Sequence, residues 1–408
     1  MPSHFWNSIK LEPWPRRRRR SDRFPSSSRQ PWYTQRVIEI LQFFLRCNRG
    51  SPFSFALCTE RSYYTEDDAQ EVMRVLLILV PESTRWQNAS MNLKMWMLPT
   101  LYRIKHRLPL LRTLDLRSST DDPADDSVPE LYDDLFETAP LLASIAVRIS
   151  LSTWKFNWSF LTFIRLSDAF DDESFYKALP HAVRLQKLQI NTTLNTHRID
   201  SSLLPITRTI KLPSLKHLSI ISCRFLPFLE APALVDFQIY SVIWDSMTDV
   251  VIDFLRRSSC QLHHLFLERY GATSMTRIWL HAPDVRHLCI LSSQLSGVFI
   301  WLSGDKSGRV PDLETLRVFN REKNLGDEDL DNLLHLVTSR ACTSIDDRKG
   351  LKQLAIYEYQ QRKMAPEEVM WEKLRSSSRN LGVDLQVLSP HTFSCPFCDQ
   401  AKRMPDYM

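Results

Sequence analysis

The sequence is poor in several features that mark common classes of protein. Glycine occurs only 8 times in 408 residues, which argues against the glycine-rich loops that hold phosphate groups. No G-x-S-x-G, H-E-x-x-H, P-loop or G-x-G-x-x-G motif is present, so we expect neither enzymatic activity nor a cofactor. The longest apolar run, Val75–Val80, is far shorter than the ~20 residues of a membrane span, so we expect no membrane contact.

Charge and cysteine usage narrow the class further. The net charge is only +5, and the consecutive block Arg16–Arg20 accounts for it, so the rest of the chain is close to neutral and no specific nucleic-acid partner is expected. The 8 cysteines mostly stand singly beside apolar runs, and no signal peptide opens the chain. We therefore predict an intracellular protein with reduced thiols, in the cytoplasm or the nucleus. The arginine block is either a weak nuclear-import signal or a solvated basic linker.

One cysteine pair stands apart from the others, in the tail. Cys395-Pro396-Phe397-Cys398 has the spacing of a redox dithiol or of half a zinc site, and His391 is the one further ligand nearby. A redox motif of this kind needs a thioredoxin-type domain after it, and a zinc site needs a second pair. An inert tail is the simpler interpretation, and a metal or redox role through this motif is the alternative.

The dominant feature is a repeated L-x-x-L-x-L core. Its copies start 19 to 38 residues apart, and in six of them a proline stands two residues before the first core position. The L-x-L part alternates as a strand does, and one such strand cannot bury its apolar face alone, so neighbouring copies must stack. We predict an α/β fold: an irregular leucine-rich-repeat solenoid with a parallel sheet on its concave side and helices and turns on its convex side. The copies span residues 111–116, 142–147, 161–166, 185–190, 215–220, 234–239, 262–267, 285–290, 313–318 and 351–356.

Other patterns complete the predicted organisation. We expect a partly disordered N-terminal segment with the arginine-rich linker over residues 1–35, the solenoid with its two capping units over 36–390, and a flexible tail over 391–408. Apolar periodicity and caps predict the helices 35–46, 65–80, 128–139, 172–179, 246–257, 327–339 and 365–378. Alternation predicts further strands at 52–57, 86–93 and 382–388.

The third and fifth positions of each core should face the concave surface, where a partner would bind. His217, Asp236, His264 and His287 occupy successive third positions, which suggests either a metal or pH-sensitive site or simply a polar binding face. Phe163 and Phe266 are aromatic candidates for anchoring a partner, and the alternative is that neighbouring side chains cover them. The predicted partner-binding residues are Phe163, Arg165, Lys187, His217, Asp236, His264, Phe266, His287 and Arg317.

Several short motifs follow one another before and within the repeats. They are Phe5-Trp6-Asn7-Ser8-Ile9, the helix at Val37–Leu45, the strand at Pro52–Leu57, Arg85-Trp86 with Leu93, the Leu108–Leu116 repeat, Ala231-Pro232-Ala233-Leu234, and Cys260 with Leu262. Their order resembles the F-box-like leucine-rich proteins expanded in mushroom-forming fungi. The resemblance covers roughly residues 3–388.

The resemblance implies a function and also a missing part. In that family an F-box docks the Skp-type linker of a cullin ubiquitin ligase, and it should precede the segment that Phe5 begins, where only four residues stand. The implied function is therefore a protein-interaction module that recognises a protein target on its concave sheet without delivering it for ubiquitylation. The alternative is an intact ligase subunit whose F-box is lost through a truncated gene model, in which case the Skp-type linker and cullin are also partners.

Overall fold

The computed structural model divides into two compact units, residues 1–205 (unit 1) and residues 206–408 (unit 2). Both are α/β, and each contains seven parallel strands that follow one another in chain order among the described residues. This arrangement confirms the predicted α/β class and the stacking of successive strands. The structure describes residues 8–11, 32–48, 50–57, 66–118, 134–148, 155–167, 172–191, 209–240, 245–268, 270–291, 295–303, 312–320, 327–341, 350–358 and 368–388.

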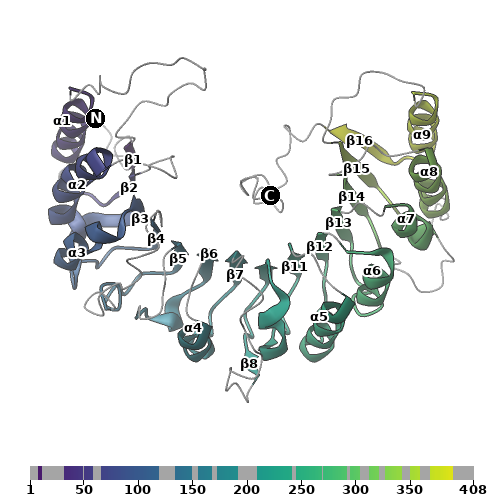
Figure 1. Cartoon of the computed structure of the whole chain (residues 1–408), viewed down its shortest axis with the longest axis horizontal. Helices are drawn as coiled ribbons and strands as arrows, with labels where there is room; N and C mark the ends of the chain where they lie inside the picture. Colours follow the sequence, from purple (N-terminus) through teal and green to yellow (C-terminus); the bar gives the residue numbers. More distant parts are fainter. Residues whose placement is uncertain are drawn as a thin grey trace. The chain divides into compact units, whose positions relative to one another are not determined.

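Unit 1 forms its strand row from β1 to β7. In Figure 1 its helices lie on one side of that row. The strands are β1 Ser8–Leu11, β2 Phe53–Leu57, β3 Trp86–Leu93, β4 Thr113–Ser118, β5 Ser144–Arg148, β6 Phe163–Ser167 and β7 Lys187–Asn191. The helices are α1 Trp32–Cys47, α2 Glu66–Leu79, α3 Leu98–Leu101 and α4 Asp172–Ala178.

Unit 2 repeats the plan, and its helices also lie on one side of the strands (Figure 1). In each unit no helix of the described part covers the other face of the strands, which we call the open strand face of that unit. The strands of the row are β9 His217–Ile220, β11 Asp236–Ile239, β12 His264–Glu268, β13 His287–Leu291, β14 Thr315–Asn320, β15 Gln353–Glu358 and β16 Asp384–Leu388, and β8 Ile210–Lys211 pairs separately with β10 Leu229–Glu230. The helices are α5 Asp245–Ser258, α6 Ala272–Trp279, α7 Leu295–Ser303, α8 Asp327–Ala341 and α9 Glu368–Asn380.

The proline before the repeat core sits in a tight turn. The N–H of Leu111 donates to the carbonyl of Leu108 at 3.4 Å, and the N–H of Leu215 donates to that of Leu212 at 3.2 Å. Pro109 and Pro213 are the second residues of these turns, where a fixed φ near −65° is favoured and no N–H is needed. The proline therefore shapes the approach to the strand in the copies that carry it.

A second recurring contact aligns each strand with the one before it. The carbonyl of Arg112 accepts the N–H groups of Ala143 and Ser144 at 3.0 and 3.1 Å, and the carbonyl of His263 accepts those of Arg286 and His287 at 3.0 and 2.9 Å. This pair of hydrogen bonds to one carbonyl oxygen recurs from strand to strand, and it brings equivalent core positions side by side in the sheet. The rows of side chains described below follow from this register.

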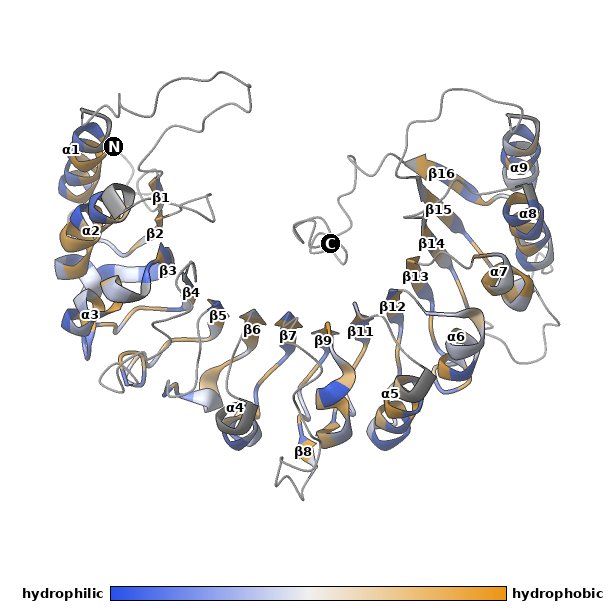
Figure 2. Cartoon of the chain, in the orientation of Figure 1, coloured by the Kyte–Doolittle hydropathy of each residue, from blue (hydrophilic) through white to orange (hydrophobic). Residues whose placement is uncertain are grey.

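The leucines of the core form the interior. Leu111, Leu114 and Leu116 are completely buried, while Thr113 and Asp115 between them are partly exposed, as predicted for the two faces of a strand. Hydrophilic and hydrophobic residues occur on the same helices (Figure 2), as expected where one side of a helix is buried against a sheet.

The side chain of Arg85 links several segments at the start of unit 1. Just before β3, the guanidinium of Arg85 pairs with Glu82 at 2.7 Å and donates to the carbonyl oxygens of Ser51, at 3.0 Å, and Asn48. It also lies 5.3 Å from the ring centre of Phe53. The Arg-Trp motif of the sequence is therefore a structural joint between strands β2 and β3.

The local predictions mostly hold. All ten repeat cores form strands that begin at the third core position, and the strands predicted at 52–57, 86–93 and 382–388 are present. The helices predicted at 35–46, 65–80, 172–179, 246–257, 327–339 and 365–378 correspond to α1, α2, α4, α5, α8 and α9.

One predicted helix is wrong in the part that the structure describes. Residues 134–138 of the predicted helix 128–139 form turns, and residues 128–133 lie outside the described ranges. Conversely, α3, α6 and α7 were not predicted. The arginine block Arg16–Arg20, the tail 391–408 and its pair Cys395 and Cys398 also lie outside the described ranges. Among the helices that are described, none combines the length and apolar character needed to cross a membrane.

Candidate interaction surface

Three rows of side chains cross the open strand face of unit 2. Strand pairing places the third core positions side by side in row A: His217, Asp236, His264, His287, Thr315, Gln353 and Asp384. The fifth positions form row B: Ser219, Gln238, Phe266, Cys289, Arg317, Ala355 and Gln386. The seventh positions form row C: Ile221, Tyr240, Glu268, Leu291, Phe319 and Tyr357, the last four aligned by strand pairing.

In unit 1 the structure brings three predicted partner-binding residues together. Phe163 on β6 lies opposite Lys187 on β7, and the ammonium of Lys187 is 5.7 Å from the phenyl ring centre. The guanidinium of Arg165 is 5.5 Å from the same ring, and its Nε donates to Oε1 of Gln189 at 2.7 Å. This aromatic ring, partly exposed and flanked by two cations, suits contact with an acidic or aromatic surface.

Near the first strands of the unit 2 surface, Asp236 belongs to a network of hydrogen-bonded side chains. Its carboxylate accepts hydrogen bonds from Nε2 of Gln238 at 3.1 and 3.2 Å and lies 3.3 Å from Nδ1 of His217. The hydroxyl of Tyr240 donates to Oε1 of Gln238 at 2.9 Å. The side chain of Asp236 is 5% exposed against 45% for His217. His217 is therefore accessible, whereas Asp236 acts mainly as the acceptor that orders its neighbours.

The two central histidines form a stacked pair. The rings of His264 and His287 are 4.4 Å apart between centroids and 12° from parallel. Partial burial lowers the pKa of His264 to about 4, with a smaller contribution from the neighbouring imidazole, and burial also lowers the pKa of His287. Both rings are therefore neutral near pH 7.

The histidine row does not form a metal centre. Within the residues that the structure describes, no group of three or more His, Cys, Asp or Glu side chains is placed to hold a metal ion. Neighbouring strands bring the imidazoles into a stack, with their rings face to face, and a stack does not converge on one point as ligands must. The alternative of a polar face fits this geometry better than the metal site.

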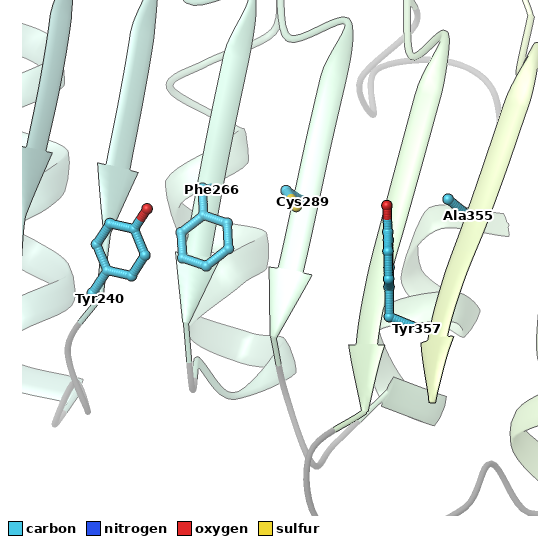
Figure 3. Close-up of a cluster of buried hydrophobic side chains, with 5 residues drawn as sticks. All are labelled: Tyr240, Phe266, Cys289, Ala355 and Tyr357. Atoms are coloured by element: carbon cyan, nitrogen blue, oxygen red, sulfur yellow. The ribbon is translucent and has the colours of Figure 1, made fainter. Parts of the chain in front are cut away.

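Phe266 requires a correction. It was expected either to anchor a partner or to be covered by its neighbours, and with only 3% of its surface exposed the second alternative holds. Its ring packs against that of Tyr240, with centroids 4.7 Å apart. It belongs to a buried cluster across successive strands (Figure 3), whose members are Tyr240, Phe266, Cys289, Ala355 and Tyr357. Phe266 therefore stabilises the face from within.

The seventh core position is the feature that the sequence reasoning missed. The repeat was defined over six positions, so Tyr240 and Tyr357, which follow the sixth, were not considered. Phe319 and Tyr357 stack with ring centroids 4.3 Å apart, and Leu291 and Ile221 pack against the same cluster. In the copies of unit 2 this seventh position is apolar or aromatic except at Glu268, and that pattern was a signal available in the sequence.

A small pocket opens among these rows. It has a volume of about 180 Å³ and lies over strands β11 to β15 of unit 2. Its wall includes His264, His287 and Arg317 of the predicted set, together with Thr315 and Gln353. Asp236 and Phe266 line it as well. Five predicted residues therefore meet at one pocket in unit 2, apart from the cluster of Phe163, Arg165 and Lys187 in unit 1.

No protein-family model matches the sequence, and no curated protein is similar enough to it to count as a match.

Proposed function

We propose that this chain is a protein-interaction module that binds a partner protein on its open strand face. In this proposal the repeats are leucine-rich repeats of an irregular solenoid, resembling the substrate-recognition part of F-box ubiquitin-ligase adaptors. The observation that carries the proposal is the difference between the two faces of each strand. Leucines fill the face toward the helices, and charged, polar and aromatic side chains occupy the other face.

The chemistry of that face suits protein recognition. Arginine and aromatic residues dominate the energetics of many interfaces, and the face presents Phe163 with Arg165 in unit 1 and Arg317 in unit 2. Its polar groups are held in place by one another, as Asp236 is by Gln238, so less side-chain entropy is lost when a partner binds. Such a face offers binding without requiring chemistry of its own.

Affinity capture with matched charge reversals tests the proposal. The tagged full chain and its Lys187→Glu and Arg317→Glu variants are used to capture proteins from cells of the source organism, and the captured proteins are identified by mass spectrometry. Arg256→Glu is the control, because Arg256 lies on helix α5 with its side chain 63% exposed. We expect one or both face variants to lose proteins that the parent and the control retain.

Retention of every captured protein by both face variants would contradict the proposal, and so would an equal loss in the control. The same experiment addresses the ligase role implied by the resemblance. The presence of a Skp-type linker and a cullin among the captured proteins would support delivery of the target for ubiquitylation. In that case both variants, Lys187→Glu and Arg317→Glu, should still capture the linker and the cullin.

A further inference from the structure

The pocket on unit 2 has the size of one amino-acid side chain. Its volume of about 180 Å³ falls below the roughly 300–1,000 Å³ of sites that enclose whole small molecules. It also opens on the face that the proposed function assigns to a partner protein. The size therefore favours a single side chain inserted from a partner over a free ligand.

One end of the pocket is rich in hydrogen-bond donors. Arg317 and Thr315 lie on strand β14, between His287 on β13 and Gln353 on β15. Arg317 lines the pocket, and Glu314, the acidic residue that acts on His287 from just before the same strand, is itself paired with Lys352 at 3.0 Å. A guanidinium carries five N–H donors and no acceptor, so it can serve an incoming acceptor in addition to its contacts within the chain. This end is therefore suited to an anion.

The opposite end of the pocket carries an acidic side chain whose carboxylate already accepts hydrogen bonds within the chain. Asp236 lies on β11, three strands from Arg317, which corresponds to about 14 Å along the sheet. Its carboxylate accepts hydrogen bonds from Gln238 and contacts His217. A negative group is thus attracted to the Arg317 end and repelled from the Asp236 end, which gives the pocket a direction.

Between the two ends the pocket is neutral and partly apolar. The stacked rings of His264 and His287 are uncharged near pH 7, because burial lowers their pKa values. Phe266 and Cys289 contribute buried apolar surface beside them. A ligand with a short hydrocarbon stem and a single negative tip matches this sequence of environments.

We infer that the pocket receives one acidic side chain, aspartate or glutamate, of the partner protein. The carboxylate accepts hydrogen bonds from the guanidinium of Arg317, with the hydroxyl of Thr315 and the imidazole of His287 as further donors. The methylene stem lies over Cys289 and Phe266. This inference rests on the proposed function and adds to it the chemistry of the partner's anchor.

Capped amino acids provide a direct test that needs no knowledge of the partner. N-acetyl-glutamate N-methylamide is titrated into the full chain, and the ring resonances of His264 and His287 are followed by NMR after selective histidine labelling. The matched probe is N-acetyl-glutamine N-methylamide, which has the same shape without the charge. We expect a saturable shift of the His287 ring with the glutamate derivative and affinity at least about tenfold weaker for the glutamine derivative.

Variants tie the preference to the proposed contact. Arg317→Met should remove the difference between the two probes, and Arg317→Lys should keep part of it, because it retains the charge but loses the forked geometry. Arg277→Met is the control, because Arg277 pairs with Asp249 on the helix side of unit 2. Unchanged circular dichroism and thermal unfolding of each variant establish that the fold is kept.

Three results would overturn the inference: equal affinity for the two probes, a glutamate preference that survives Arg317→Met, or no histidine response to either probe up to its solubility limit. These results are distinguishable from failure of the proposed function. Suppose that Lys187→Glu loses captured proteins while the titration gives one of these three results. Partner binding on the open strand face then stands, and the acidic anchor is wrong.

Discussion

Replacing Leu265 by aspartate tests the arrangement of the strands most directly. Leu265 is the second residue of β12 and is 1% exposed. Strand pairing places it between Phe237 on β11 and Leu288 on β13, both also buried. The substitution removes an apolar side chain from the middle of the unit 2 interior and introduces a carboxyl group with no partner.

The magnitude follows from two separable costs. Truncating a buried leucine typically costs about 2–5 kcal/mol of unfolding free energy. The new carboxyl group will take up a proton rather than remain charged in the interior, and at pH 7 this costs about 4 kcal/mol, because its ordinary pKa is near 3.9. The total of about 6–9 kcal/mol lies within the range of about 5–15 kcal/mol by which domains are normally stable. We therefore expect unit 2 to lose most or all of its stability at pH 7.

Two further variants make the experiment specific. Leu265→Asn introduces a polar group of the same shape that does not titrate, so only the aspartate variant should recover stability, by about 1.4 kcal/mol per pH unit, as the pH falls from 7 toward 4. Leu280→Asp is the exposed control, because Leu280 is 62% exposed just after helix α6. It should cost no more than about 1 kcal/mol, from the negative charge at a helix C-terminus.

Thermal unfolding followed by circular dichroism, together with limited proteolysis, measures these differences. A Leu265→Asp protein that is as stable and as resistant to protease as Leu280→Asp would refute the inward assignment of the fourth core position. Equal pH dependence of Leu265→Asp and Leu265→Asn would instead refute the assignment of the cost to protonation of the buried carboxyl group.

Three further predictions concern packing, titration and thiol reactivity. A Cβ added at Gly297 would lie 2.9 Å from the Cβ of Ala272, so Gly297→Ala should lower the melting temperature and Ala272→Gly should partly restore it; additive losses would contradict this close contact. Because the folded pKa of His264 is about 4 against 6.5 unfolded, acidification from pH 6.5 to 4 protonates the unfolded chain first. Stability should fall by about 1–2 kcal/mol after allowance for screening at this half-buried ring, and pH-dependent melting of His264→Gln should show a smaller loss. Burial raises the pKa of Cys223 to about 12, so at pH 8 a thiol reagent should modify the exposed Cys47 rapidly and Cys223 only on unfolding, which mass spectrometry of the labelled peptides would show.

Helix prediction failed where the tertiary structure supplies the stability. The segment Ala272–Trp279 is short and contains two threonines, which are weak helix formers, and Leu295–Ser303 is apolar around most of its circumference. The apolar residues Met275, Ile278 and Trp279 do follow a helical period, whereas Leu295–Ser303 shows little periodicity. Both segments form helices that pack closely, since a Cβ added at Gly297 would lie only 2.9 Å from the Cβ of Ala272. The opposite error, at residues 134–138, assigned a helix to a segment that forms turns.

The candidate site was also predicted in part, in its order along the sheet but not in its burial. The alternation of the core correctly predicted that His217, Asp236, His264 and His287 would occupy neighbouring positions on successive strands. It did not predict how far each side chain is buried. Asp236 and Phe266 are covered because residues of adjacent strands and of the seventh core position, such as Tyr240, pack over them.

By itself the sequence determined the strands, the residues that point into the core and the order in which the side chains cross the sheet. These properties depend on the two-residue period of an extended backbone, which is local and therefore visible in the pattern of leucines. Only the tertiary structure decided which outward side chains are accessible, that two histidines stack, and that Arg317, Thr315 and His287 share a pocket. Those properties depend on contacts between residues 23 to 38 positions apart, whose distances are set when the repeats stack.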